Sequence, residues 1–285
     1  MIRYWAGFFA LVLVSFASPL HAQTPASVNC QGPLVQGGFL ICRLPENFGS
    51  YRIETNTGKT TNISHEHPAL IPFSRNSPLD ITLRFHPQTA ASHPAIQPQK
   101  FTLSPGQWDI ERIDGLPPGK VTPRSAKDQK KVAADWGKKQ KAWKHRAPSS
   151  WYANGFIEPV AKTRTSGVFG SQRILNGQPK NPHLGLDFAA PKGTPIIAPA
   201  RAEVVLAEPD MYFEGGLLVL DHGAGVMSVM LHMSSLDVAV GDIVAQGQKL
   251  GSVGMTGRAT GPHLHWGIKV RGSYINPELV LGFAG

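Results

Sequence analysis

Two histidine pairs with the same spacing occur in this sequence. The segment SHEHP holds His65 and His67, and the segment GPHLHWG holds His263 and His265. In an extended strand, residues i and i+2 point to the same face, so either pair can direct two imidazole rings into one small volume. Imidazole is a common metal ligand and a common general base. The spacing indicates metal or proton-transfer chemistry, but it does not say which pair performs it.

Three further polar groups accompany the second pair in a glycine-rich part of the chain. His183 and Asp187 lie in PHLGLD, and His232 lies in MLHM. Pro182 and Gly185 argue against a helix in PHLGLD, and on a bent, extended segment the two side chains fall on one side. Two histidines and one carboxylate make a ligand set typical of catalytic zinc, which keeps a fourth position for water. The conjunction predicts a zinc centre.

The histidines of the first half of the chain lack such a setting. His65, His67, His86 and His93 lie in loop-like surroundings rich in proline, with no carboxylate at ligand spacing. A metal site needs three or four convergent groups. We therefore expect these four histidines on the surface or in loops.

The segments that carry the second set of histidines resemble a known family. GVFGSQRILNGQPKNPHLGLDFAAPKGTP, MLHM and TGRATGPHLHWGIKV are similar to the lysostaphin-type (LytM-like) zinc metallopeptidases, which cleave peptidoglycan peptides. The resemblance covers residues 164–278 and includes HxGxD, the LHM histidine, TGPHLH and the APKGTP hairpin. The first part of the chain, ending in WDIERIDGLP, resembles more loosely a β-sandwich that precedes the peptidase domain in some secreted bacterial relatives.

The resemblance implies an exported zinc endopeptidase acting on peptidoglycan stem peptides or cross-links, with one Zn²⁺ per catalytic domain. It assigns zinc binding to His183, Asp187 and His265, and the catalytic proton-transfer and oxyanion roles to His232 and His263. Because no HExxH motif is present, histidine takes the base role that glutamate has in helix-based zinc proteases. Either His232 or His263 can be the principal base.

Two positions near these motifs differ in what they imply. Met230 stands where relatives commonly carry tyrosine, so a hydroxyl that could contact substrate is missing. If Met230 and the loops from Phe169 to Pro182 shape the cleft, specificity resides there. His222, in DHGAG, matches a recurrent family position without a ligand role, and we predict a turn histidine there.

The pattern of short apolar runs predicts a mainly β protein. GGFLICRL, SYRIETN, LDITLRF and WDIERI are broken by turn residues, and they predict a β-sandwich domain over residues 23–118. LGLDFAA, GGLLVLDHG, VMSVMLHM and HLHWGIKV predict an antiparallel β peptidase domain over residues 151–285, with no long helix.

A basic linker helix is expected between these domains, over residues 119–150. Pro123 suits the first turn of a helix, and a tryptophan-bearing stripe of Val132, Trp136, Gln140 and Trp143 recurs at helical spacing. The net charge of the chain is +9, and Lys120 to Arg146 contain ten basic and two acidic residues. Basicity confined to one segment argues against a nucleic-acid surface. The helix either packs its stripe on a neighbouring domain or attracts anionic envelope polymers or lipids.

The first residues have the form of a secretory signal peptide. Arg3 precedes an apolar run from Trp5 to Ala17, and small residues follow to Ala22, so residues 1–22 are expected to be removed. The alternative is an uncleaved N-terminal anchor. Without a lipobox, a sorting motif or a wall-binding repeat, a periplasmic location is favoured.

The two cysteines lie near the start of the exported chain. Export places Cys30 and Cys42 where disulfides persist, and a bond across a strand pair is favoured over two buried thiols.

Two other functions compete with that of an enzyme. GDIVAQGQKLG resembles hairpins of lipoyl and biotinyl carrier domains, but Lys249 and Lys269 lack the context of a modified lysine. The second alternative is a metal-free, degenerate peptidase domain that activates a partner cell-wall amidase. Such proteins usually lack one or more metal ligands, whereas this sequence keeps all of them.

Overall fold

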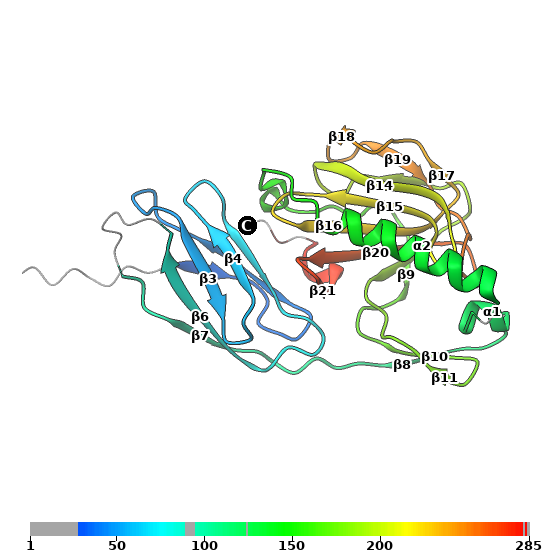
Figure 1. Ribbon diagram of the computed structural model, residues 1–285, viewed down its shortest axis with the longest axis horizontal. Helices are drawn as coiled ribbons and strands as arrows, with labels where there is room; N and C mark the ends of the chain where they lie inside the picture. The colour runs from blue at the N-terminus through cyan, green and yellow to red at the C-terminus, as the bar shows by residue number, and fades with distance from the viewer. Residues whose placement is uncertain (1–27, 89–94, 124, 282, 284–285) are drawn as a thin grey trace, which may run out of the picture.

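Two β-rich parts and one long helix make up the protein in the computed structural model (Figure 1). The structure describes residues 28–88, 95–123, 125–281 and 283. The expected signal peptide and His93 lie outside these residues. None of the helices in the described ranges combines the length and apolar character needed to cross a membrane.

The N-terminal part is a sandwich of two antiparallel sheets, as predicted. One sheet contains β1 (Asn29–Gln31), β2 (Phe39–Arg43) and β5 (Ala69–Pro72). The other contains β4 (Thr60–Ile63), β3 (Tyr51–Thr55), β6 (Asp80–Pro87) and β7 (Gln99–Thr102). Buried residues alternate along β6, so one face of its sheet packs into the core. Cys30 and Cys42 face each other across β1 and β2 and form a disulfide, which confirms the predicted bond.

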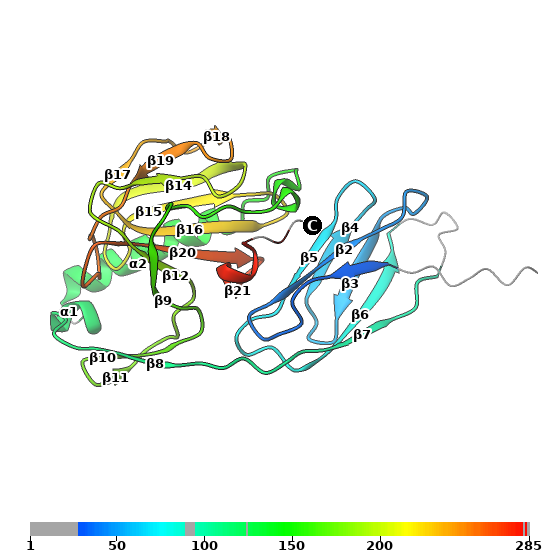
Figure 2. The same cartoon turned by 180° about the vertical axis from the view of Figure 1, so that it is seen from behind.

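One strand expected in the sandwich lies elsewhere. WDIERI forms β8 (Ile110–Ile113), which pairs in parallel with β10 (Gln172–Leu175), and β11 (Gln178–Pro179) follows on the far edge. The chain crosses from one part to the other along this strand (Figure 2). None of the four residues of β8 is fully buried, so the strand has no apolar face to offer the sandwich core. It instead satisfies its backbone hydrogen bonds on the edge of β10.

The linker contains a short helix α1 (Pro118–Val121) and a long helix α2 (Ala126–Ala142). The prediction that Pro123 lies in the first turn is wrong. The helix begins at Ala126 because the Ser125 hydroxyl caps it, accepting from the Asp128 N–H at 3.0 Å.

Helix α2 contacts the C-terminal part mainly through polar groups. Trp143 packs on a buried cluster, but Trp136 remains 52% exposed beside it. Three of its lysines bind the C-terminal part, with Lys131 donating to the Asp210 carbonyl, Lys138 pairing with Glu208 and Lys139 pairing with Glu214. The stripe is therefore only partly used for packing. Attraction of the other lysines to anionic polymers or lipids stays a prediction.

The C-terminal part is built on one large antiparallel sheet. Its strands are, in spatial order, β18 (Ile243–Val244), β14 (Ala202–Met211), β15 (Gly215–Asp221), β16 (Val226–Met233), β20 (His263–Val270), β12 (Leu186–Ala189) and β9 (Arg164–Gly167), with β21 (Ser273–Ile275) beside β20. A smaller sheet contains β13 (Pro195–Ile197), β19 (Lys249–Ser252) and β17 (Ser235–Leu236). This part also contains two 3-10 turns, η1 (Trp151–Asn154) and η2 (Pro277–Leu279). The mainly β fold class is confirmed.

The two faces of the large sheet are covered differently. Leu264, Trp266 and Ile268 of β20 point into the main buried core. The opposite face carries the alternating residues of the same strand, and α2 lies across part of it (Figure 1). The half of this face that α2 leaves open holds the histidines at the start of β20.

Candidate metal centre and cleft

The three predicted ligands are brought together by one strand pair and one loop. Asp187 of β12 stands opposite His265 of β20 in an antiparallel register. His183 lies just before β12, where its N–H donates to the Ser171 carbonyl at 2.8 Å and its carbonyl accepts from the Gly170 N–H at 2.8 Å. These two bonds join the segment that carries His183 to the connection between β9 and β10.

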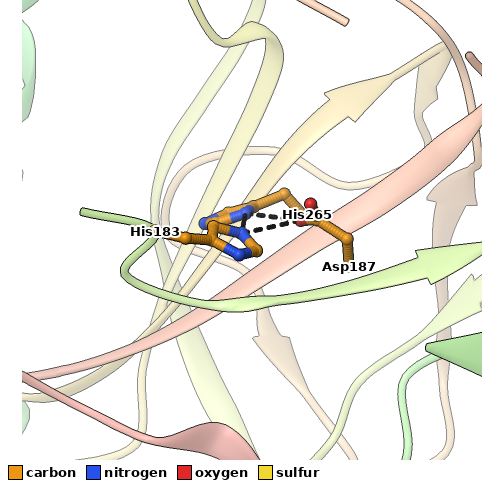
Figure 3. Close-up of side chains that lie close together, drawn as sticks. All are labelled: His183, Asp187 and His265. Atoms are coloured by element: carbon orange, nitrogen blue, oxygen red, sulfur yellow. Dashed lines mark hydrogen bonds and ion pairs between the residues drawn. The ribbon is translucent and has the colours of Figure 1, made fainter. Parts of the chain in front are cut away.

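The ligand atoms converge in a buried cluster (Figure 3). Asp187 Oδ1 lies 3.0 Å from His183 Nε2 and 2.8 Å from His265 Nδ1, and the two nitrogens are 2.9 Å apart. Within the part of the chain that the structure describes, no other group of three or more histidine, cysteine or acidic residues lies close enough together to hold a metal ion.

The protonation states of this cluster suit a cation. His183 Nδ1 lies 2.9 Å from the Val168 carbonyl, so a ring that binds a cation can keep its proton on Nδ1, donate it there and turn the Nε2 lone pair toward the cation. Burial lowers the pKa of His265 to about 4, which keeps its ring neutral near pH 7. Burial opposes ionisation of Asp187, but hydrogen bonds with both histidines outweigh it and hold its pKa well below the usual range.

Two neutral nitrogens and one carboxylate oxygen within about 3 Å of one another are suitable ligands for a divalent transition metal.

Two glycines let the ligands approach so closely. A Cβ on Gly167 would lie 2.5 Å from Asp187 Oδ2, and a Cβ on Gly185 would lie 2.5 Å from His265 Nε2. Any side chain at either position would displace a ligand. The glycines around HxGxD thus have a packing role in the site.

Arg173 and Glu111, which the sequence did not indicate, form an ion pair that contacts Asp187 on the side away from the two imidazoles. Arg173 on β10 donates from Nη2 to Asp187 Oδ2 at 3.3 Å, and its Nε donates to Glu111 Oε2 at 3.0 Å. The two oxygens of Asp187 therefore have different partners, since Oδ1 faces the imidazoles and Oδ2 faces the guanidinium. Glu111 and Arg173 are register partners across β8 and β10, so only the parallel pairing could have revealed them.

The two predicted catalytic histidines lie beside each other on the rim of the cluster. His232 and His263 have ring centroids 4.7 Å apart. Nδ1 of His232 lies 2.8 Å from the Thr256 carbonyl, and Nδ1 of His263 lies 2.8 Å from the Gly261 carbonyl. A proton on each Nδ1 donates to its carbonyl, so each Nε2 is left as an acceptor. Both rings are thus held in the tautomer that a general base needs.

His232 is the more constrained of the two. Its φ is +67°, a left-handed conformation that is uncommon outside glycine and asparagine and that clusters at functional sites. Burial, together with the nearby charges of His263 and His265, lowers the pKa of His232 to about 3. The ring is consequently neutral at pH 7.

Other sequence predictions for this region come out differently. Met230 is fully buried in the main core, so it cannot line the cleft. His222 does lie in the β15–β16 turn, but it is fully buried. Its Nδ1 donates to the Arg201 carbonyl at 2.9 Å and its Nε2 accepts from the Ser228 hydroxyl at 2.7 Å. Neither residue joins the metal cluster.

The three described histidines of the sandwich lie outside this cluster, and His86 lies on strand β6 and not in the expected loop. His65 and His67 are exposed in the loop between β4 and β5. The fold does bring Glu46 to 3.9 Å from His65 Nε2, and Glu54 to 3.0 Å from His86 Nε2. Among the residues that the structure describes, neither pair has a third ligand.

A pocket of about 1130 Å³ adjoins the metal cluster through Arg173. It lies between α2, the β10–β11 hairpin and the turn that joins β14 to β15. The loop that was expected to shape the cleft, between Phe169 and Pro182, thus contributes one wall.

Comparisons with known proteins concentrate on this part of the chain. Residues 181–277 match the sequence model of peptidase family M23. The peptidoglycan DD-endopeptidase ShyA of Vibrio cholerae is 43% identical over 117 residues, which is 41% of this chain and 27% of ShyA. The DD-carboxypeptidase/endopeptidase Mpg of Neisseria meningitidis is 36% identical over 124 residues, which is 44% of this chain and 28% of Mpg. The chain therefore matches less than a third of each relative's length.

One solved structure extends the likeness to the sandwich. A putative peptidase M23 from Pseudomonas aeruginosa is 27% identical, with a TM-score of 0.65. The superposition covers 88% of this chain and 96% of the other. The sandwich and the linker are thus part of the shared architecture.

Proposed function

We propose that this chain, which belongs to peptidase family M23 through its C-terminal part, is an exported zinc endopeptidase that hydrolyses peptide bonds in peptidoglycan stem peptides or cross-links. The observation that carries the proposal is the convergence of His183 Nε2, Asp187 Oδ1 and His265 Nδ1 beside two histidines with free Nε2 atoms. The substrate class follows the names of the relatives, which include peptidoglycan DD-endopeptidases.

Zinc is the metal that the donor set favours. His183, Asp187 and His265 supply two nitrogens and one oxygen, the pattern of catalytic zinc sites that keep an open position. Oxygen-rich sets suit magnesium and calcium instead. When bound, zinc would supply Lewis acidity to the scissile carbonyl and to the attacking water.

The protein's own residues then account for the proton movements. Nε2 of His232 or His263 accepts a proton from water as the water oxygen bonds to the carbonyl carbon. The protonated ring can then donate a hydrogen bond to the oxyanion and finally give the proton to the leaving nitrogen as the C–N bond breaks. The carbonyls of Thr256 and Gly261 hold both rings in position through this cycle.

An extracytoplasmic location agrees with this substrate and with the disulfide. Peptidoglycan lies outside the cytoplasmic membrane, and disulfides such as Cys30–Cys42 persist in oxidising compartments. We place the protein in the periplasm after removal of residues 1–22. The alternative of a metal-free amidase activator is disfavoured because all three ligands are present and converge.

Digestion of purified cell-wall sacculi tests the proposal. The exported chain should release cross-link fragments with new termini, identified by mass spectrometry, and a chelator should stop the release until zinc is restored. The variant His265→Ala should release none, and His65→Ala serves as the matched control. Intact cross-links with the wild-type protein and zinc would contradict the substrate assignment.

A further inference from the structure

The pocket beside the metal centre has an excess of positive charge. Six charged residues line it, namely Asp135, Lys139, Arg173, Lys180, Glu214 and Arg258. Four are cations and two are carboxylates. The site already described uses one of them, Arg173, to support Asp187.

Four of these six residues are neutralised by near neighbours. The pairs are Lys131–Asp135 at 2.8 Å, Lys139–Glu214, and Arg173–Glu111 at 3.0 Å. Lys180 donates to the neutral oxygens of Thr122 and Gln178. Arg258 donates from Nη1 to the Lys120 carbonyl at 3.3 Å. Neither Lys180 nor Arg258 has a carboxylate partner among the residues that the structure describes.

Arg258 is the more firmly placed of these two cations. Its N–H donates to the Phe213 carbonyl at 2.8 Å, and its guanidinium stacks over the Phe213 ring at 4.7 Å. Burial and the nearby charge of Arg173 lower the pKa of Arg258. The negative charge of Glu214 opposes this shift without cancelling it, and Glu214 is already paired with Lys139.

The loop that carries Arg258 also orients the catalytic histidines. The Thr256 carbonyl, two residues earlier, accepts from His232, and the Gly254 carbonyl accepts from the His263 N–H at 3.2 Å. A Cβ on Gly257 would lie 2.4 Å from the Gly215 nitrogen, so the loop packs tightly on its neighbour. Arg258 therefore stands at a fixed place on the same rim as the reacting centre.

We propose that Arg258 binds a free carboxylate of the peptide substrate, and that the pocket between α2 and the β10–β11 hairpin is the subsite for an acidic residue near the scissile bond. A planar guanidinium with open donors matches a carboxylate in two-point hydrogen bonding. The aromatic face of Phe213 and the Lys120 carbonyl hold it ready, so little ordering is needed on binding. The proposal rests on the proposed peptidase function and adds a requirement for acidic peptides.

The first test varies the substrate and leaves the protein unchanged. Disaccharide-peptide dimers released from sacculi by a muramidase are used with their carboxylates intact or converted to amides. The wild-type protein should cleave the amidated dimers with a KM roughly ten- to a hundredfold higher, because a charge-assisted hydrogen bond is lost. Equal KM values for both substrates would overturn the proposal and leave the peptidase function standing.

The second test varies the residue. Arg258→Gln should raise KM for the intact dimers by the same factor and leave KM for the amidated dimers unchanged. Arg258→Lys should fall between, since ammonium keeps the charge but not the planar fork. Arg84→Gln, which removes an exposed arginine from the sandwich, is the control for net charge. An Arg258→Gln protein that loses both substrates equally would contradict carboxylate recognition.

A binding measurement separates this proposal from the proposed function. Calorimetric titration of intact dimers into the catalytically disabled variant His263→Ala should show binding that Arg258→Gln weakens at least tenfold. Weakened binding supports the subsite even if no cleavage is detected. Binding unaffected by Arg258→Gln rejects the subsite even if the protein cleaves peptidoglycan.

Discussion

The two HxH pairs of this chain differ in everything except their spacing. His65 and His67 are exposed in a loop between β4 and β5, whereas His265 is buried and His263 half-buried on a central strand. The loop position offers one exposed carboxylate, Glu46, at 3.9 Å. The strand position has ligands from a neighbouring strand and a loop within 3.0 Å. The HxH spacing alone therefore does not identify a metal site, because the other ligands come from distant segments of the chain.

The neighbours of the two segments explain this difference. β20 lies between β16 and β12, so Leu231 and Asp187 both flank His265. SHEHP is a turn closed by its own Ser64, whose hydroxyl accepts from the His67 N–H at 3.1 Å. His67 Nδ1 also lies 3.2 Å from Ser150 Oγ, but both histidines of this turn stay exposed, while a central strand holds its side chains against other elements.

Removing one histidine from each pair should give the largest contrast. His265→Ala deletes a proposed metal ligand and should lower the rate of peptidoglycan cleavage by about a thousandfold or more. His65→Ala should change the rate by less than about twofold, because His65 is exposed and lies outside the metal cluster. Timed release of fragments from sacculi measures both. Similar losses in the two variants would break the comparison.

The catalytic histidines should be separable from the ligands. His263→Ala and His232→Ala should each lower kcat by about a hundredfold or more through loss of proton transfer, with the metal content retained. His67→Ala is the matched control from the other pair. Steady-state kinetics and elemental analysis of the same preparations measure kcat and metal content. Loss of the metal in either variant would contradict the assignment of that histidine to proton transfer.

Acid should destabilise the folded protein through its buried neutral histidines, and His222 is one example. Its pKa is about 4 in the folded protein because of burial, against 6.5 when unfolded. Between these values the unfolded chain binds more protons, so the free energy of unfolding falls as the pH falls. The loss is about 2 kcal/mol from pH 6.5 to about pH 5.

Denaturant unfolding at a series of pH values measures this effect. His222→Gln should flatten the dependence in that window, and His65→Gln should leave it unchanged. A pH dependence that is identical in wild type and His222→Gln would show that His222 does not carry it.

Disrupting the Glu111–Arg173 pair beside Asp187 should have the smallest effect. Glu111→Gln leaves Arg173 uncompensated beside Asp187 and should weaken metal binding by about tenfold. Competition with a chromogenic chelator measures the affinity without any activity assay. Glu54→Gln, which removes the exposed partner of His86, is the control and should have no effect. An unchanged metal affinity in Glu111→Gln would show that the Glu111–Arg173 pair does not influence metal binding.

The sequence predicts the fold class from local patterns, and it predicts the convergence of His183, Asp187 and His265 through the family resemblance, since these ligands lie 78 to 82 residues apart across the two segments. Alternating apolar runs predict the strands, and the resemblance carried by HxGxD and TGPHLH implies the cluster. The support from Arg173 and Glu111 is invisible to such reasoning, since a parallel pairing of β8 with β10 joins segments 62 residues apart in the chain. Met230 was misplaced because strand alternation fails where His232 adopts a positive φ. The roles of the site residues remain predictions.

Metal content tests the central claim most directly. The wild-type protein and a His65→Ala/His67→Ala double variant, both dialysed against zinc and then buffer, should each retain about one zinc ion per chain by elemental mass spectrometry. The variants His183→Ala and His265→Ala should retain almost none. Zinc lost from the double variant, or zinc retained by His265→Ala, would contradict the account.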